Sequence, residues 1–273
     1  MAQRFLPRIV FADMDDTFLD TGKGVPAANR KLLDVLARHD VPFVPCTGRP
    51  VSAVPDEVLA HPATRFAIGA NGSVVHDVSA NRRLHVVGMD KRAVLSLYER
   101  VRSAQTTFDV FADGEVYSER ARYEAMGLYG IDAPSLEMLR RVRIPVDQSV
   151  PQIIERACVV EKVTCFWRTP HDRDLLREAI GDERGLCSAS GHPKNFELQA
   201  AGVSKGSALG WLCAHLGIDV ADAVAFGDAE NDVSMLEVAG DGVAVANAIP
   251  RVLEVADHVT LDCNHAGVAH YLL

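Results

Sequence analysis

Three carboxylates directly follow a short apolar run near the amino terminus, and this arrangement constrains the fold more than any other feature. The run, residues 8–12, reads Arg-Ile-Val-Phe-Ala and has the β-branched, apolar character of a buried parallel strand. The acids Asp13, Asp15 and Asp16 come next. Open α/β sheets bind ligands at the carboxyl ends of their strands. Because crowded carboxylates repel one another, a hard divalent cation such as Mg²⁺ is expected among them.

Two other interpretations of this segment were weighed. An acidic surface turn would have a similar composition, since Asp is common in turns. A calcium-binding loop would need Gly at its sixth position and Glu at its twelfth, where this chain has Phe18 and Gly24. The spacing therefore excludes the calcium loop and leaves the acidic turn open for this segment alone.

Three further segments place polar side chains at the end of a strand or the start of a helix. They are Thr47 after the strand-like run 41–46, Lys205 at the start of a helix in Gly202-Val203-Ser204-Lys205-Gly206, and Asp228 and Asp232 after the strand-like run 223–226. Four unrelated surface turns would not explain this fixed order. The pattern is the one that a phosphoryl-transfer site needs, with acids, a hydroxyl and a cation at one edge of a sheet.

In their order and in their residues, these four segments resemble the four motifs of the haloacid dehalogenase-like (HAD) hydrolase superfamily. The resemblance extends to the Cof-type phosphatases, which carry a large α/β cap, through Asn71-Gly72 after a strand, the segment 202–206 and residues 264–268. Together these motifs frame almost the whole chain. The resemblance implies an α/β fold, with a doubly wound parallel-sheet (Rossmann-like) core and an inserted α/β cap domain.

The resemblance also implies catalytic roles. Asp13 is expected to attack phosphorus and become a transient aspartyl-phosphate, and Asp15 to serve as acid for the leaving alcohol and as base for water. Thr47 is expected to donate a hydrogen bond to a phosphoryl oxygen. Lys205 is expected to hold the phosphate and the nucleophile together.

The expected metal is Mg²⁺, held by Asp13, the backbone carbonyl of Asp15 and Asp228, with Asp232 as either a ligand or a supporting acid. The expected substrate-binding set is Thr47, Gly48, Arg49, Asn71 and Lys205. Within this set, Arg49 is expected to support its loop rather than to take part in the chemistry. Asn71 either orients a phosphate or a water molecule, or only shapes the turn before Gly72.

The order of patterns along the chain predicts two domains. The core domain is expected to comprise residues 1–84 and 192–273, with residues 85–191 as the inserted cap that sets substrate specificity. Within the insertion, Leu95, Tyr98 and Val101 have helical spacing, and residues 159–166 form a strand-like run. A larger group of aromatic and basic cap residues suggests substrate contacts, although packing and surface charge explain them more simply; they are Tyr117, Arg120, Arg122, Trp167 and Arg168.

Composition limits the partners. The chain has 28 basic and 37 acidic residues and a net charge of −9, which argues against a general nucleic-acid surface. No stretch approaches the roughly 20 apolar residues of a membrane span, and Arg4 and Arg8 interrupt any secretory apolar region. The six cysteines lack zinc-site spacing and are typical of a reducing compartment. A cytoplasmic location is expected, and the oligomeric state is not specified.

The sequence therefore predicts a Mg²⁺-dependent phosphomonoester hydrolase that acts through an aspartyl-phosphate on a small phosphorylated metabolite, with a sugar phosphate as the first candidate. One alternative is a phosphosugar mutase of the same superfamily, in which a sugar hydroxyl instead of water accepts the phosphoryl group. The other is a regulator that binds a phosphorylated ligand without turnover.

Overall fold

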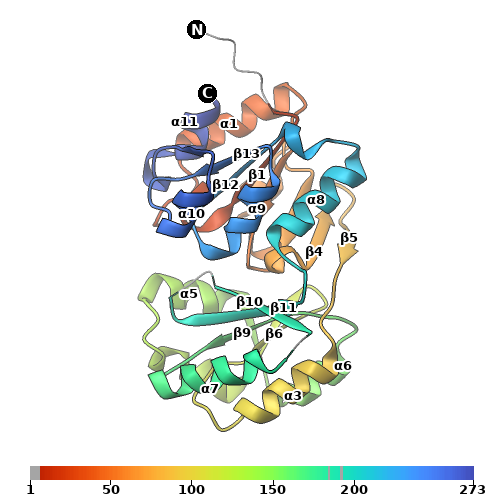
Figure 1. The fold of residues 1–273 in the computed structure, drawn as a ribbon, viewed down its shortest axis with the longest axis vertical. Helices are drawn as coiled ribbons and strands as arrows, with labels where there is room; N and C mark the ends of the chain where they lie inside the picture. Colours follow the sequence, from red (N-terminus) through yellow and green to blue (C-terminus); the bar gives the residue numbers. More distant parts are fainter. Residues whose placement is uncertain (1–6, 184, 191–192) are drawn as a thin grey trace. The chain divides into compact units, whose positions relative to one another are not determined.

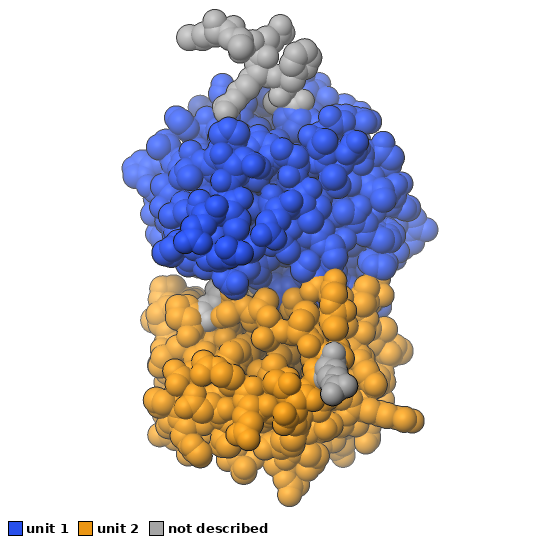
Figure 2. Space-filling view, viewed as in Figure 1, with its two compact units in different colours: residues 1–85, 204–273 blue, residues 86–203 orange. Residues whose placement is uncertain are grey.

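The computed structural model describes residues 7–183, 185–190 and 193–273 (Figure 1). The chain divides into two compact units (Figure 2). Unit 1 comprises Met1–His85 and Ser204–Leu273, and unit 2 comprises Val86–Val203. Each unit has its own sheet and its own hydrophobic core.

Unit 1 is built on an eight-stranded sheet with the order β14-β13-β12-β1-β2-β3-β4-β5. From β14 to β3 all neighbouring strands pair in parallel, and β4 is antiparallel to β3. The strands are β1 Ile9–Asp13, β2 Phe43–Cys46, β3 Phe66–Gly69, β4 Val74–Asp77, β5 Arg82–Val86, β12 Ala223–Gly227, β13 Asp241–Ala244 and β14 His258–Val259. The order reverses on either side of β1, which confirms the predicted doubly wound sheet.

Helices cover both faces of this sheet. Val10 and Ala12 pack on the side of α1 and α11, whereas Ile9 and Phe11 pack on the side of α8, α9 and α10. The helices of unit 1 are α1 Ala27–Arg38, α2 Asp56–Leu59, α8 Lys205–Leu216, α9 Val233–Val238, α10 Pro250–Val255 and α11 Gly267–Leu272. Because successive side chains of a strand point to opposite faces, a strand covered on both faces is apolar throughout, as β1 is before Asp13.

Unit 2 is built on a six-stranded sheet with the order β10-β11-β9-β6-β7-β8. Its strands are β6 Asp109–Ala112, β7 Glu115–Glu119, β8 Arg143–Val146, β9 Val160–Phe166, β10 Leu186–Ala189 and β11 Asn195–Ala200. Its helices are α3 Lys91–Val101, α4 Arg120–Glu124, α5 Ala133–Val142, α6 Val150–Arg156 and α7 Pro170–Gly181. The core of the unit lies between the sheet and the helices α3, α6 and α7. The helix predicted at Leu95 and the strand predicted at residues 159–166 are confirmed.

The return of the chain from unit 2 to unit 1 comes after β11. This strand pairs in an antiparallel manner with both β9 and β10, so it belongs to the sheet of unit 2. The boundary expected at residue 192 lies outside the described residues and precedes this strand. Within the part of the chain that the structure describes, no helix is long and apolar enough to cross a membrane.

Candidate active site

Asp13 is the last residue of the central strand β1 and is buried. Because β1 pairs in parallel with β2 on one side and β12 on the other, the carboxyl ends of these three strands lie at one edge of the sheet. Thr47 directly follows β2, and Asp228 directly follows β12. Just after Asp13 the chain makes an irregular turn, in which Asp16 has a left-handed φ of 60°. The candidate site is therefore at the point where the strand order reverses.

Lys205 lies at the first position of α8 and its side chain is completely buried. Its ammonium group donates hydrogen bonds to Asp13 Oδ1 at 2.5 Å and to Asp232 Oδ1 at 2.6 Å. The helix start is fixed by Ser204, whose hydroxyl accepts a hydrogen bond from the Ser207 backbone N–H at 3.0 Å. A buried charge of this kind persists only when it is paired, and Lys205 has two partners.

Two glycines allow the start of α8 to approach the turn after β3 and the start of α9. Gly72 has a φ of +101°, and a Cβ atom there would lie 2.1 Å from the carbonyl oxygen of Ser204. A Cβ on Gly206 would lie 2.2 Å from the carbonyl oxygen of Ser234. Only glycine fits at such contacts, so both positions contribute to the placement of Lys205.

The electrostatics of this cluster are dominated by burial. Burial raises the pKa of Asp13 well above its usual range, and repulsion from Asp232 and Asp228 adds to the rise, while the charge of Lys205 opposes it. Burial by itself would lower the pKa of Lys205, yet Asp13 and Asp232 together outweigh it and raise that pKa. Lys205 therefore stays charged, and the carboxylates still exceed the cations that face them.

The side chains of Asp13, Asp228 and Asp232 could hold a metal ion, since one oxygen atom of each lies within 4.8 Å of the others. Burial and the charge of Asp232 raise the pKa of Asp228 to about 7, against a hydrogen bond from Thr17 Oγ1 at 2.8 Å. Hard carboxylate oxygens with too few cations among them are the donor set that suits Mg²⁺.

The two oxygens of Asp232 already accept hydrogen bonds. Oδ1 accepts from Lys205 at 2.6 Å, and Oδ2 accepts from the backbone N–H groups of Asp228 and Ala229, each at 3.0 Å. Asp232 thus joins Lys205 to the backbone of the loop that carries Asp228.

Asp15 has different surroundings from Asp13. Its carboxylate Oδ1 accepts a hydrogen bond from Arg49 Nη2 and lies 3.3 Å from Lys23 Nζ. Lys23 also contacts Asp16 at 2.9 Å. Burial would lower the pKa of Lys23, but Asp15 and Asp16 outweigh that effect and raise it. The two neighbouring acids of the first motif are thus held by separate cations, Asp13 by Lys205 and Asp15 by Arg49 and Lys23.

The loops after β2 and β3 are joined by a backbone hydrogen bond. The hydroxyl of Thr47 accepts a hydrogen bond from the backbone N–H of Arg49 at 3.0 Å, across Gly48. The Thr47 carbonyl accepts one from the backbone N–H of Asn71 at 3.1 Å. The side-chain oxygen of Asn71 accepts a hydrogen bond from the amide of Asn231 at 3.1 Å. Asn71 therefore connects the loop of Thr47 to the loop of Asp228 and Asp232.

Three comparisons place the chain in a family. The model of the haloacid dehalogenase-like hydrolases matches residues 10–272. The chain belongs to this family. It is 29% identical to the putative phosphatase YxeH of Bacillus subtilis strain 168, with 96% of each chain covered. It is 27% identical to an HMP-PP phosphatase of Citrobacter koseri, over 98% of this chain and 95% of the relative.

A solved structure of a haloacid dehalogenase-like hydrolase from B. subtilis has a TM-score of 0.84 to this chain, with 26% identity, covering 97% of this chain and 98% of that one. The expected resemblance is confirmed: the protein is a HAD-like hydrolase of the Cof type, and its enzyme class is that of the phosphatases.

Three residues of this HAD-like site were given no role from the sequence: Thr17, Lys23 and Asn231. Thr17 and Asn231 lie inside the motifs that were recognised, so their position was a signal that could have identified them. Lys23 lies between two glycines and has a φ of 64°, which marks a tight turn. Cys46 also lies beside the site, but burial raises the pKa of its thiol, which therefore stays protonated and unreactive.

Proposed function

We propose that this HAD-like phosphatase is a Mg²⁺-dependent phosphomonoester hydrolase that acts on a small phosphorylated metabolite, first of all a sugar phosphate. The single observation that supports this most strongly is the buried contact of Lys205 with Asp13 at 2.5 Å, beside Asp228 and Asp232. A lysine that approaches one carboxylate at the end of a strand, next to a set of metal-type oxygens, is suited to bind a phosphoryl group.

In this proposal the carboxylates of Asp13 and Asp228 hold Mg²⁺, and the backbone carbonyl of Asp15 is a third ligand. When bound, Mg²⁺ would offset negative charge on the phosphoryl oxygens. Asp232, whose oxygens accept hydrogen bonds from Lys205 and from backbone N–H groups, is assigned a supporting role. It fixes the direction of the Lys205 side chain and the shape of the loop.

The reaction proceeds in two steps. A carboxylate oxygen of Asp13 attacks phosphorus, the bond between phosphorus and the leaving oxygen breaks, and Asp15 donates a proton to that oxygen. Water then attacks the phosphorus of the aspartyl-phosphate while Asp15 accepts its proton, which releases inorganic phosphate and restores Asp13. Lys205 favours the ionised form of Asp13, since its charge opposes the effect of burial.

Arg49 and Lys23 position Asp15 in this proposal. Both cations contact the same oxygen, Oδ1, of the Asp15 carboxylate. With Oδ1 held in this way, Oδ2 is the oxygen that transfers the proton. Thr47 and Asn71 remain candidates for phosphate contacts, with their loops fixed by the hydrogen bonds between them.

The test is release of inorganic phosphate from a panel of sugar phosphates, nucleotides and HMP-PP, in Mg²⁺ and in EDTA. The proteins are wild type, Asp13→Asn and the control Asp40→Asn, whose side chain is 82% exposed. We expect release that requires both Mg²⁺ and Asp13 and that Asp40→Asn leaves unchanged. Undiminished release in EDTA or in Asp13→Asn would refute the proposal. An isomeric sugar phosphate instead of inorganic phosphate would identify a mutase.

A further inference from the structure

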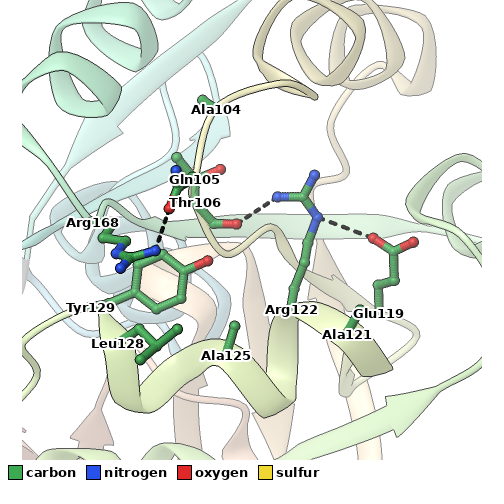
Figure 3. Close-up of a pocket in the computed structure, with 10 residues that line it drawn as sticks. All are labelled: Ala104, Gln105, Thr106, Glu119, Ala121, Arg122, Ala125, Leu128, Tyr129 and Arg168. Atoms are coloured by element: carbon green, nitrogen blue, oxygen red, sulfur yellow. Dashed lines mark hydrogen bonds and ion pairs between the residues drawn. The ribbon is translucent and has the colours of Figure 1, made fainter.

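Unit 2 contains a pocket of about 370 Å³, and all ten residues that line it belong to unit 2 (Figure 3). One wall is formed by α4 and the turn Ala125–Leu128 that follows it. The opposite wall is formed by Gln105 and Thr106, ahead of β6, and by Arg168, after β9. The volume is within the range of small-molecule sites.

Tyr129 offers a donor to this pocket. The residue is only 5% exposed, and its hydroxyl points into the pocket (Figure 3). No hydrogen bond joins this hydroxyl to any of the residues that the structure describes. Burial raises the pKa of Tyr129, so the hydroxyl keeps its proton near neutral pH. The ring is buried while the hydroxyl is open to the pocket, so an acceptor atom of a ligand can reach it.

Arg168 offers a positive charge to the same pocket. Its Nη1 donates a hydrogen bond to Gln105 Oε1 at 2.5 Å, which is a neutral partner. Among residues 7–183, 185–190 and 193–273, no carboxylate forms an ion pair with Arg168. A guanidinium presents donors in a planar fork that matches a carboxylate or a phosphate.

The other arginine of the pocket, Arg122, has a structural role. Its Nε pairs with Glu119 at 3.1 Å, and its Nη1 donates to the carbonyl of Thr106 at 2.5 Å. Arg122 and Glu119 balance each other, so the charge of Arg168 makes the pocket positive. In a chain of net charge −9, such a site is suited to an anion.

Two more features point to an organic ligand. The hydroxyl of Thr106, which also lines the pocket, is buried and has no hydrogen-bond partner within the described chain. The wall formed by Ala121, Ala125 and Leu128 is apolar, and Leu128 is 60% exposed. An exposed leucine beside unpaired donors matches a ligand with one charged end and one apolar side.

We propose that this pocket binds a small organic anion, whose carboxylate or phosphate oxygens accept hydrogen bonds from Arg168 and Tyr129 while its apolar part lies against Leu128. The anion is a metabolite separate from the phosphate ester that reacts in unit 1, and its binding regulates turnover. Binding here does not depend on hydrolysis in unit 1.

The test is calorimetric titration of the full-length protein in EDTA with benzoate and with phenylphosphonate. The variants are Arg168→Gln, Tyr129→Phe and the control Arg173→Gln, an arginine of α7 whose side chain is 37% exposed. We expect wild type to bind at least one probe. Affinity should fall roughly tenfold or more in Arg168→Gln and several-fold in Tyr129→Phe, and stay unchanged in Arg173→Gln.

Absence of binding to wild type, or equal affinity in wild type and both pocket variants, would overturn the proposal. Thermal melting of each variant checks that it is folded, and Tyr129→Phe removes only one oxygen atom. Because the titration does not involve turnover, it remains decisive even if no phosphate is released from any substrate.

Phosphate release then tests the regulatory role. A probe that binds should change kcat for p-nitrophenyl phosphate in wild type without competing with it, and should have a much smaller effect in Arg168→Gln. Competition between the probe and the substrate would overturn the proposal.

Discussion

At the scale of single residues, the site distinguishes two acids that lie two positions apart. Asp13 is buried and paired with Lys205, whereas the Asp15 side chain is 30% exposed and paired with Arg49 and Lys23. Different surroundings allow neighbouring carboxyl groups to serve as nucleophile and as proton donor. Because burial raises the pKa of Asp13, the proposed division of roles needs the charge of Lys205, together with that of bound Mg²⁺, to keep Asp13 ionised.

Asp15→Asn should separate the two chemical steps. The leaving group of p-nitrophenyl phosphate needs no proton, so phosphorylation of Asp13 should persist, while attack by water should slow by about 10²- to 10⁴-fold. Stopped-flow absorbance should then record a burst of about one nitrophenolate per enzyme before a slow steady state. Asp16→Asn, at the adjacent position, should keep its steady-state rate within a few-fold. Equal loss of burst and steady state in Asp15→Asn would argue against the assignment.

The raised pKa of Asp228, about 7 against an ordinary 3.8, predicts how stability depends on pH without metal. As pH rises from about 4 to 7, the unfolded chain loses this proton before the native protein does, so the native state loses stability. Asp228→Asn removes this loss. Urea unfolding in EDTA measures the unfolding free energy of both proteins near pH 5 and near pH 8. The stability of the variant relative to wild type should be greater near pH 8 than near pH 5. An identical pH dependence in the two proteins would contradict the prediction.

Residues of the site could be predicted from the sequence only where they occupy a recognised motif position. Asp13, Lys205, Asp228 and Asp232, predicted as one site, do lie together in the structure. The contact of Thr17 with Asp228 and that of Lys23 with Asp15 depend on the left-handed backbone at Asp16 and at Lys23. A residue other than glycine adopts that conformation only when its surroundings impose it, which the local sequence does not reveal.

At the scale of elements, the approach of α8 to its neighbours positions Lys205. A Cβ on Gly206 would lie 2.2 Å from the Ser234 carbonyl oxygen, at the beginning of α9. In the same helix, a Cβ on Gly210 would come no closer than 3.9 Å, to Val238 Cγ1. The two glycines thus form a matched pair for testing this packing.

Gly206→Ala should destabilise the protein by about 1–3 kcal/mol and lower kcat, because α8 must shift and Lys205 must shift with it. Gly210→Ala should stabilise it by up to about 1 kcal/mol at unchanged kcat, since alanine is the better helix former. Urea unfolding measures the change in stability of both variants, and steady-state kinetics measure the change in kcat. Unchanged stability and unchanged kcat in Gly206→Ala would contradict the role given to this contact.

A strand whose residues are all apolar could be predicted from the sequence. A strand whose residues alternate between polar and apolar could not be assigned to one of the two sheets. The run before Asp13 is covered on both faces and is apolar throughout, so its assignment as a buried strand was secure. The strand β11, Asn-Phe-Glu-Leu-Gln-Ala, alternates polar and apolar residues and would suit either sheet. Only its pairing with β9 and β10 assigns it to unit 2.

At the scale of the whole molecule, the chain consists of two units with separate cores, and all the proposed catalytic residues belong to unit 1. Unit 1 is formed from both ends of the chain, so Asp13 meets Lys205 across 192 residues of sequence. The site therefore exists only when the two segments of unit 1 have folded together.

Mg²⁺ should raise the melting temperature, because it binds the assembled carboxylates of the native state and not the unfolded chain. At a concentration of 100 times its Kd, such a ligand adds about 2.7 kcal/mol. Scanning calorimetry in Mg²⁺ and in EDTA should show the shift for wild type and a much smaller one for Asp228→Asn. The same shift in both proteins would place the metal elsewhere.

The central claim, covalent catalysis through Asp13, is tested most directly by trapping the phosphoryl-enzyme. Wild type with Mg²⁺ is mixed with a substrate that carries a radiolabelled phosphoryl group, quenched in acid within one turnover, and digested for peptide mapping. We predict label on the peptide that contains Asp13 in wild type, and none on any peptide of Asp13→Asn. Label on a different residue, or turnover of wild type with no labelled protein at any time, would contradict the account.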